Sequence, residues 1–168
     1  MGYSTDFDGE FTCTPALNQA QVAYLQAFAS SRRMKRDPTI ASNFPDPLRN
    51  AVGLCIGAEG DFYVGGAAQD CGQAHDSSVL DYNKPPAGQP GLWVQWEPSE
   101  DGAHIRWDGG EKFYNYVEWL EYYIQNFFIP WGITLNGTVR WRGEDFDDVG
   151  TIEVEDNVVT VSNEFHGR

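Results

Sequence analysis

The chain has 168 residues, of which 41% are hydrophobic and 14% aromatic, and this composition excludes a largely disordered protein. Its 25 Asp and Glu residues against 11 Lys and Arg residues give a formal net charge of −14. Such a charge argues against direct binding to nucleic acid or to an anionic membrane surface, since both need a basic face. We expect no signal peptide, and no apolar run approaches the roughly 18 residues of a membrane-spanning helix.

Three cysteines lie far apart in the sequence, at positions 13, 55 and 71. A disulfide scaffold of this size would need more of them, so we expect reduced thiols and a cytoplasmic protein. A single bridge between Cys55 and Cys71 stays open as an alternative.

The N-terminal region predicts a strand followed by a helix. Residues 3–13 alternate between apolar and polar side chains, as in a half-buried strand, and Gly9 within them predicts a bulge. Asn18 is a helix N-cap, with glutamine three residues later in the capping-box position. We expect this helix to continue through the basic segment 32–36 until Asp37-Pro38 ends it.

The central region, residues 37–91, carries six of the nine prolines and eight of the eighteen glycines, without a long periodic segment. Loops of this length are uncommon in compact domains. Aromatic residues are scattered through it, and they favour an ordered insertion over a flexible linker.

The C-terminal half returns to regular patterns. Alternation predicts a hairpin over 92–107, a helical stripe predicts a helix that ends at Pro130, and alternation resumes over 133–141. Residues 150–161 predict a second hairpin around Asp156-Asn157. We therefore predict a single α+β domain, with two helices on one face of an antiparallel sheet and a frayed tail at 164–168.

Three stretches of the sequence resemble a known group of proteins: Met1–Phe7, Trp107–Phe113, and Leu135–Trp141 followed by Gly143–Asp145. They are similar to an uncharacterised family of small acidic proteins found in bacteriophage and bacterial genomes. The resemblance implies a phage protein that binds a host component in the cytoplasm of the host cell. It carries no catalytic residues to this sequence.

The leading functional hypothesis is a non-enzymatic protein that binds a host protein with a basic surface, as an inhibitor or a mimic of nucleic-acid charge. Closely spaced carboxylates repel one another, and a cationic partner relieves that repulsion. An acidic, solvent-exposed edge that only keeps the protein soluble is the alternative. The candidate partner-binding residues are Glu144, Asp145, Asp147, Asp148 and an exposed Trp93.

Two other functions remain open. The protein could instead be a sequestering protein or an enzyme with a small-ligand pocket beneath the 37–91 insertion. Arg32, Arg33 and Arg36 would hold a nucleotide-like anion there, although these residues could instead pair with the protein's own carboxylates. A structural or assembly component is the third hypothesis, and the oligomeric state is not indicated by the sequence. No Gly-x-Ser-x-Gly nucleophile elbow occurs, so the sequence gives little support to a Ser/His/Asp hydrolase. The glycines of residues 57–66 lack the lysine of a phosphate-binding loop, and we expect no cofactor.

Metal binding receives two weak indications. Residues 145–156 partly follow the spacing of a calcium-binding loop, although Val149 occupies a ligand position and the flanks predict strands. Cys55, Cys71 and His75 could contribute to a zinc site, but no CxxC pair is present and buried structural cysteines are the preferred interpretation.

Overall fold

The computed structural model describes residues 2–164 and divides the chain into two compact units. The first unit contains the chain up to Leu17 and from Gln95 onward, and the second contains Asn18–Val94. Residues 37–91, predicted to be an insertion within a single domain, lie in the second unit together with the helix that precedes them.

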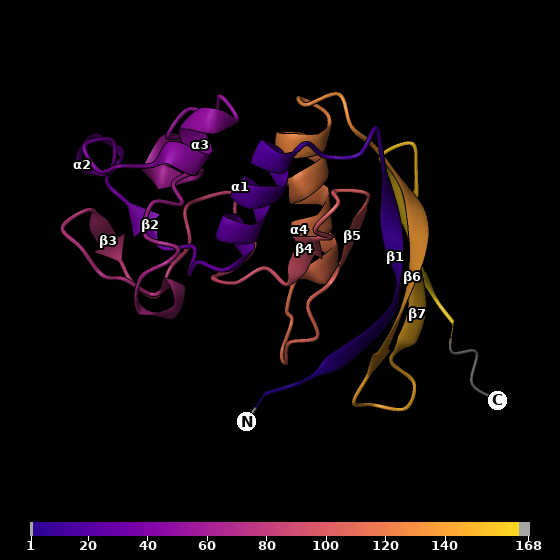
Figure 1. The fold of residues 1–168 in the computed structure, drawn as a ribbon. Helices are drawn as coiled ribbons and strands as arrows, with labels where there is room; N and C mark the ends of the chain where they lie inside the picture. The colour runs from indigo at the N-terminus through magenta and orange to yellow at the C-terminus, as the bar shows by residue number, and fades with distance from the viewer. Residues whose placement is uncertain (1, 165–168) are drawn as a thin grey trace. The chain divides into compact units, whose positions relative to one another are not determined.

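A six-stranded antiparallel sheet dominates the first unit, which confirms the α+β class (Figure 1). Its strand order is β4-β5-β1-β6-β7-β8, so the N-terminal strand lies inside the sheet and β4 and β8 form the edges. The strands are β1 (Thr5–Thr14), β4 (Trp96–Pro98), β5 (His104–Trp107), β6 (Thr134–Gly143), β7 (Val149–Glu155) and β8 (Val158–Asn163).

Both predicted hairpins form. In the first, Trp96 pairs with Trp107, although β4 begins at Trp96 and not at the predicted position 92. In the second, β7 and β8 are joined by Asp156 and Asn157, whose φ angles of 49° and 70° match the type I′ turn that suits a two-residue hairpin.

The predicted bulge at Gly9 is wrong, since β1 and β6 stay in register from Thr5 to Thr14. Gly9 has a φ of 106° and faces Val139, and a Cβ there would lie 2.5 Å from the carbonyl oxygen of Thr138. The glycine therefore permits a close approach of two backbones, which is the other role of a glycine inside a strand.

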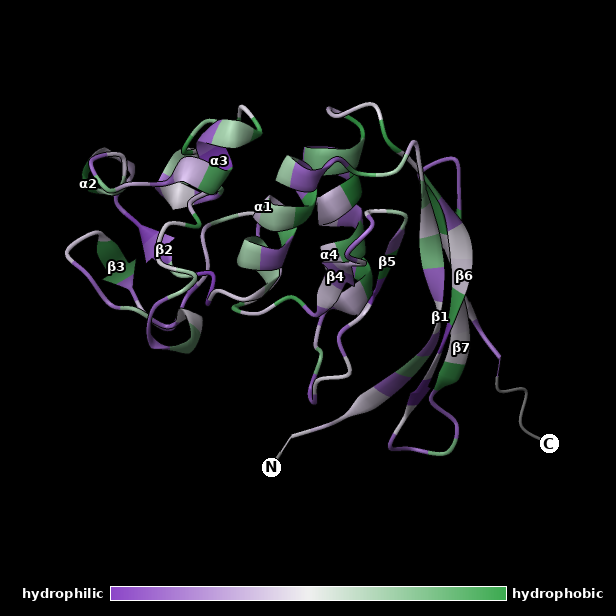
Figure 2. Ribbon diagram, in the orientation of Figure 1, coloured by the Kyte–Doolittle hydropathy of each residue, from purple (hydrophilic) through white to green (hydrophobic). Residues whose placement is uncertain are grey.

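Buried and exposed residues alternate along much of β1 and β6, as expected where successive side chains point to opposite faces of a sheet, and Figure 2 shows the hydropathy of these strands changing along their length. The inward face is rich in aromatic residues that meet edge to face. Phe7 lies at the centre of this cluster, with its ring centroid 5.4 Å from Trp96, 5.8 Å from Phe113 and 4.9 Å from Tyr116. The indole of Trp96 is fully buried and donates a hydrogen bond to the carbonyl of Tyr116.

Helix α4 (Tyr116–Tyr123) lies on the inward face of the sheet and continues into a π-helical turn, η3 (Ile124–Phe128) (Figure 1). Leu120, Ile124 and Phe127, three members of the predicted apolar stripe, are buried. The helical segment ends just before Pro130, as the sequence predicts.

The second unit contains the predicted N-terminal helix, α1 (Gln19–Ala29). The capping box is confirmed, because the side chain of Asn18 accepts from the N–H of Gln21 and the side chain of Gln21 accepts from the N–H of Asn18. Residues 37–91 are ordered around several short elements. These are α2 (Pro38–Ala41), α3 (Pro47–Ala51), 3-10 turns η1 (Ala58–Gly60) and η2 (Asp70–Gly72), and β3 (Val79–Asp81), which pairs with β2 (Lys35–Arg36).

The predicted continuation of the first helix to residue 36 is wrong. Helix α1 ends at Ala29, and the N–H of Ser30 closes its last turn by bonding to the carbonyl of Gln26 at 3.0 Å. The chain then becomes extended, and Lys35 and Arg36 form β2. Side-chain contacts of the arginines outweigh the helical propensity of this segment, as described below.

At the C-terminal end, Glu164 is held in place rather than frayed. Its N–H donates to the carbonyl of Val149, and its carboxylate pairs with Arg140 at 2.8 Å. The remainder of the predicted tail, residues 165–168, lies outside the described residues.

Candidate interaction site at the loop between β6 and β7

Four of the five predicted partner-binding residues lie in the loop of residues 144–148, which joins β6 to β7. Two backbone hydrogen bonds close this loop. The N–H of Gly143 donates to the carbonyl of Asp148 at 2.7 Å, and the N–H of Asp148 donates to that of Asp145 at 3.0 Å. The structure thus brings Glu144, Asp145, Asp147 and Asp148 together in one compact turn, which we call the acidic loop.

Asp148 attaches the acidic loop to the sheet. One oxygen of its carboxylate accepts from the indole N–H of Trp141 at 2.9 Å, and the other accepts from the hydroxyl of Tyr3 at 2.7 Å. Because both bonds involve an ionised acceptor, they are stronger than ordinary neutral hydrogen bonds. The carboxylate of Asp148 is therefore a structural anchor and not a group that is available to a partner.

Tyr3 connects the N-terminal segment to the same loop. Its hydroxyl donates to Asp148 and also accepts from the N–H of Asp145 at 3.1 Å. The bond from Asp145 favours the ionised phenolate, but desolvation and the carboxylates of Asp148 and Asp145 outweigh it and raise the pKa of Tyr3. The hydroxyl consequently keeps its proton near neutral pH and remains a donor.

Glu144 has a similar anchoring role, because its carboxylate accepts from the N–H of Ser4 at 2.6 Å. Two of the four acidic side chains are thus occupied by the N-terminal segment and the sheet. This use of the carboxylates was not predicted from the sequence, where all four counted as partner-binding groups.

Two glycines allow the loop and the sheet to approach so closely. A Cβ on Gly143 would overlap the carboxylate of Asp148 and the hydroxyl of Tyr3, and a Cβ on Gly150 would overlap the indole ring of Trp141. Trp141 is therefore able to lie across β7, where it is 7% exposed.

The tip of the acidic loop is the part that faces solvent. Phe146 is 77% exposed, the largest value among the exposed large hydrophobic residues of the described chain. Asp145 and Asp147 flank it, and within residues 2–164 their carboxylates form no hydrogen bond or ion pair. Aromatic side chains are enriched among the residues that dominate the binding energy of protein interfaces, so this tip is the part of the loop that we consider as a candidate for contact with a partner.

Trp93, the fifth predicted partner-binding residue, is not part of the acidic loop. It belongs to the second unit, is half-buried, and lies outside any strand, because β4 begins three residues later. The alternation over 92–97 from which its exposure was inferred does not extend that far toward the N-terminus.

The three arginines predicted to bind a ligand are engaged with their own unit. Arg32 stacks at 4.0 Å over the ring of Tyr82 and donates to its carbonyl. Arg33, only 3% exposed, donates to the carbonyls of Asp61 and Tyr63. Such contacts indicate a structural role, since both guanidinium groups donate to acceptors of their own unit.

Arg36 is likewise bound to residues of the second unit. It is 6% exposed and binds Asp76 in an ion pair at 3.0 Å and the hydroxyl of Ser78 at 2.7 Å. Burial alone would raise the pKa of Asp76, but hydrogen bonds from the hydroxyl and the N–H of Ser78, together with the Arg36 guanidinium, hold it below its usual range. The cavity beside the three arginines has a volume of only about 10 Å³, which leaves no space for a nucleotide.

A larger groove of about 380 Å³ occurs elsewhere in the second unit, between α1, α3 and residues 64–68. It is lined mainly by small apolar side chains, among them Ala27, Leu48 and Ala67, and by none of the predicted ligand-binding residues. The lining gives no support to a nucleotide-like anion as its occupant.

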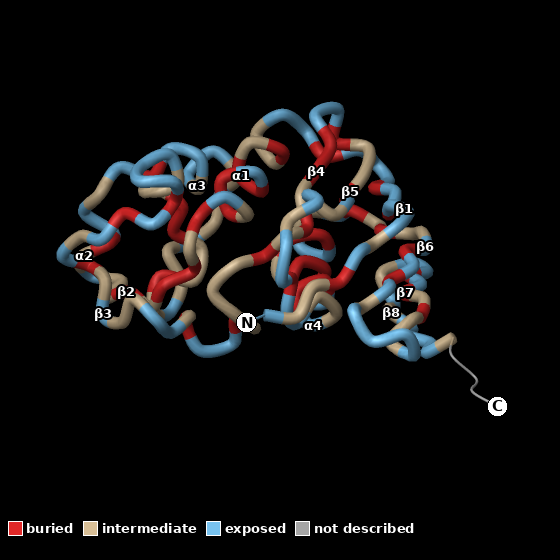
Figure 3. The backbone as a smooth tube through the Cα atoms, turned by 90° about the horizontal axis from the view of Figure 1, so that it is seen from below, coloured by how far each residue is buried: buried red, intermediate tan, exposed pale blue. Residues whose placement is uncertain are grey.

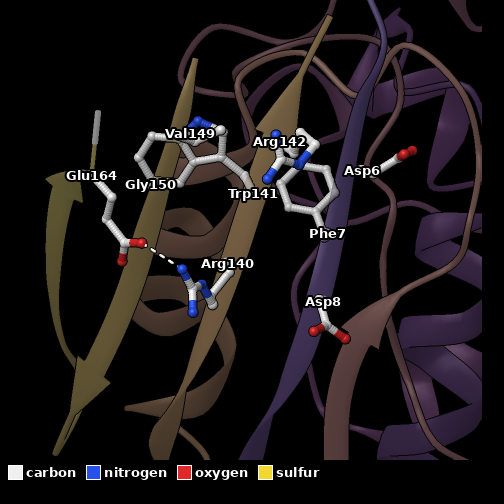
Figure 4. A pocket seen from close by; sticks show the side chains of 9 residues that line it. All are labelled: Asp6, Phe7, Asp8, Arg140, Trp141, Arg142, Val149, Gly150 and Glu164. Carbon is white, nitrogen blue, oxygen red and sulfur yellow. Dashed lines mark hydrogen bonds and ion pairs between the residues drawn. The ribbon is translucent and has the colours of Figure 1, made fainter. Parts of the chain in front are cut away.

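A shallow pocket of about 500 Å³ lies on the first unit, over β1, β6 and β7 (Figure 4). Arg140 and Arg142 project from β6 into it, with Asp6 and Asp8 on the neighbouring strand directly opposite them in register. The dashed line in Figure 4 marks the ion pair between Arg140 and Glu164. Because charges of both signs alternate here, the pocket favours neither an anion nor a cation.

Neither metal hypothesis is supported. Within residues 2–164, no three His, Cys, Asp or Glu side chains come together in a group that could hold a metal ion. The predicted calcium loop fails because most of its second half is strand β7, whose extended backbone spreads the ligands apart. Cys55 and Cys71 are free and exposed, which also corrects the expectation that they are buried.

The chain matches no protein-family profile, no curated protein and no solved structure. No helix in the described part of the chain combines the length and apolarity needed to cross a membrane.

Sequence reasoning missed the residues that shape the acidic loop, namely Tyr3, Trp141 and Phe146. For Phe146 a signal was present, because a phenylalanine inside the run Glu-Asp-Phe-Asp-Asp between two strands has no route to the core. For Tyr3 no local signal existed, since its partner Asp148 is 145 residues away.

Proposed function

We propose that the protein binds a partner protein through the acidic loop, with Phe146 as the apolar anchor and Asp145 and Asp147 as the flanking charges. The observation that carries this proposal is the 77% exposure of Phe146 at the tip of a loop that is tied down on both sides. A partner would offer an apolar pocket with a basic rim. The family resemblance suggests in addition that the partner is a host protein. It also suggests that the effect of binding is inhibition or mimicry of nucleic-acid charge.

The anchoring of the loop supports this function. Side chains and loops that must be ordered on binding reduce affinity, whereas a loop held in its bound shape avoids that cost. The bonds from Tyr3 and Trp141 to Asp148 hold the acidic loop from below and leave Phe146 at its tip.

The charge of the chain supports the basic character of the partner. A formal net charge of −14 attracts cationic surfaces over a distance and accelerates encounter at low salt. The carboxylates of Asp145 and Asp147, which have no ion-pair partner within residues 2–164, then give that attraction a defined position next to the anchor.

The experiment is to immobilise the protein, pass a bacterial lysate over it at low salt, and identify by mass spectrometry what a salt gradient releases. The wild-type chain is compared with Phe146→Ala and with a double variant, Asp145→Asn and Asp147→Asn. We expect one basic protein to be retained by the wild type, at least tenfold less retention by Phe146→Ala, and an earlier release from the double variant.

Matched controls come from the same unit. Ile129→Ala removes an exposed apolar side chain elsewhere, since Ile129 is 50% exposed, and Asp6→Asn with Asp8→Asn removes two exposed carboxylates from β1. Retention of a partner by all variants alike would overturn the role of the acidic loop. A column that releases a small molecule and no protein would favour the ligand-binding hypothesis instead.

A further inference from the structure

The two edges of the sheet differ in how well they are protected. β4 has three residues and ends at Pro98, and both features discourage pairing with another strand. β8 has six residues, Val-Val-Thr-Val-Ser-Asn, without a charge or a proline. It pairs with β7 alone among the described strands, and Figure 3 shows it largely in the colour of exposed residues.

Alternate backbone groups of β8 point to the open side. In an antiparallel pair, every second residue exchanges hydrogen bonds with its neighbour, starting from the residues that flank a two-residue turn. Val158 flanks the turn here, and the N–H of Glu164 bonds to Val149, so the residues with even numbers face β7. The N–H and C=O groups of Val159 and Val161 therefore point away from the sheet.

The inward face of β8 is also incompletely covered. Val161 is paired with Ile152 and shares its face of the sheet, yet Val161 is 46% exposed while Ile152 is fully buried. A groove of about 490 Å³ lies between η3 and the start of β8, with Ile124 and Val159 among its lining residues. This volume is sufficient for apolar side chains of a bound segment.

The outward face next to β8 is acidic. Glu153 and Glu155 are exposed on β7, opposite Thr160 and Val158, whose side chains are short. A strand added beyond β8 would lie about 10 Å from β7, twice the usual strand spacing, and an extended lysine or arginine can reach over the short side chains.

We propose that β8 takes up an extended segment of a partner as a seventh strand, one in which apolar residues alternate with basic residues. The apolar residues would contact Val159 and Val161, and the basic residues would face Glu153 and Glu155. The main-chain groups of Val159 and Val161 supply the hydrogen bonds, and the alternation supplies the specificity. A second copy of this chain fits less well, because two chains that each carry −14 repel one another.

The test uses a synthetic hexapeptide of alternating lysine and valine and measures amide hydrogen exchange in the full-length protein. We expect slower exchange at Val159 and Val161 on adding the peptide, and little change at Val158 and Thr160, whose N–H groups already bond to β7. Val161→Pro removes an outward N–H at a position where an edge strand tolerates proline, and we expect at least tenfold weaker binding. Val161→Thr keeps the N–H and should retain measurable binding.

Two control peptides separate pairing from simple charge attraction. A block peptide of three lysines followed by three valines and an alternating peptide of glutamate and valine should both bind at least tenfold more weakly. Equal binding of the block peptide, or of the lysine–valine peptide to Val161→Pro after circular dichroism has shown that this variant is folded, would overturn the proposal. Self-association of the protein that Val161→Pro abolishes would also overturn it, in favour of a second copy.

This surface is independent of the acidic loop. Phe146→Ala is expected to leave peptide binding at β8 unchanged, and Val161→Pro is expected to leave intact the partner capture described above. The two proposals therefore fail separately.

Discussion

The indole N–H of Trp141 donates to the carboxylate of Asp148 at 2.9 Å, and this bond joins the core of the sheet to the surface loop. Trp141 is almost buried and its ring lies against Gly150 on β7. The position of the acidic loop is consequently set by side chains that also stabilise the fold. A change in the packing of Trp141 is therefore expected to move the loop, so the position of the acidic loop and the stability of the fold are coupled through this pair.

Replacing Tyr3 by phenylalanine tests the second anchor of the loop. The variant loses the donor to Asp148 and the acceptor of the Asp145 N–H, so we expect several-fold faster hydrogen exchange at the Asp145 amide and a slightly lower melting temperature. Tyr114→Phe is the matched control, because its hydroxyl accepts from the N–H of Tyr3 and does not bond to the loop. If the Asp145 amide exchanges at the same rate in both variants and in the wild type, Tyr3 does not hold the loop in place.

Gly143→Ala is expected to destabilise the protein, because the new Cβ would overlap the carboxylate of Asp148 and the hydroxyl of Tyr3. Overpacking of this kind costs about 1–3 kcal/mol, and denaturant unfolding measures it. Gly66→Ala provides the comparison, since its Cβ would meet only Ala74 at an ordinary contact distance of 3.7 Å. If the two substitutions change the free energy of unfolding equally, the close approach at Gly143 does not contribute to stability.

Much of the fold could be predicted because local patterns decide it. The alternation along β1 and β6, the Asp156-Asn157 turn and the Asn18 capping box all depend on residues close in sequence, and each is present in the structure. The end of the first helix could not be predicted in this way. It depends on contacts of Arg33 with the carbonyls of Asp61 and Tyr63, about 30 residues away.

The sequence predicts which acidic residues belong to the candidate site, but not which role each of them has. The sequence places four carboxylates in one loop, yet only the structure separates the anchors Glu144 and Asp148 from the exposed Asp145 and Asp147. That distinction arises from the N-terminal segment, which reaches the loop through pairing of β1 with β6. Contacts between residues so far apart in the sequence produce no periodic pattern from which they could be predicted.

The pH dependence of stability is expected to contain a contribution from Asp61. Burial of its carboxyl, with the charge of Glu59 adding to the effect and Arg33 opposing it, raises the pKa of Asp61 from 3.8 to about 6. Because the folded protein holds this proton more tightly than the unfolded chain, the contribution stabilises the protein below pH 4 and is lost as the pH rises through 6. A pKa unit corresponds to 1.36 kcal/mol, and since solvent screens this half-buried carboxyl we expect about 1 kcal/mol in total.

Asp61→Asn isolates this effect from the other carboxyl groups. The variant keeps the backbone carbonyl that accepts from Arg33 and Gln89 and removes only the titrating group. We expect the variant to be more stable than the wild type at pH 7 and the difference to disappear near pH 4, as measured by urea unfolding across that range. A stability difference that does not change with pH would contradict the raised pKa.

The three cysteines should differ in reactivity. Cys13 lies in β1, is 4% exposed, and burial raises the pKa of its thiol to about 12, so about one in ten thousand of these thiols is ionised at pH 8. Cys55 and Cys71 are exposed. We expect a thiol reagent at pH 8 to modify two groups rapidly in the native protein and the third only after local or global unfolding.

The same titration tests the bridge between Cys55 and Cys71 that the sequence leaves open. If those two residues were joined in the protein as isolated, no thiol would react rapidly until a reductant was added, and two would then appear. Three rapid thiols would show instead that Cys13 is accessible, which would contradict its burial between β5 and β6 at the centre of the sheet. Mass spectrometry of the modified peptides assigns each thiol, so the three outcomes are distinguished in one measurement.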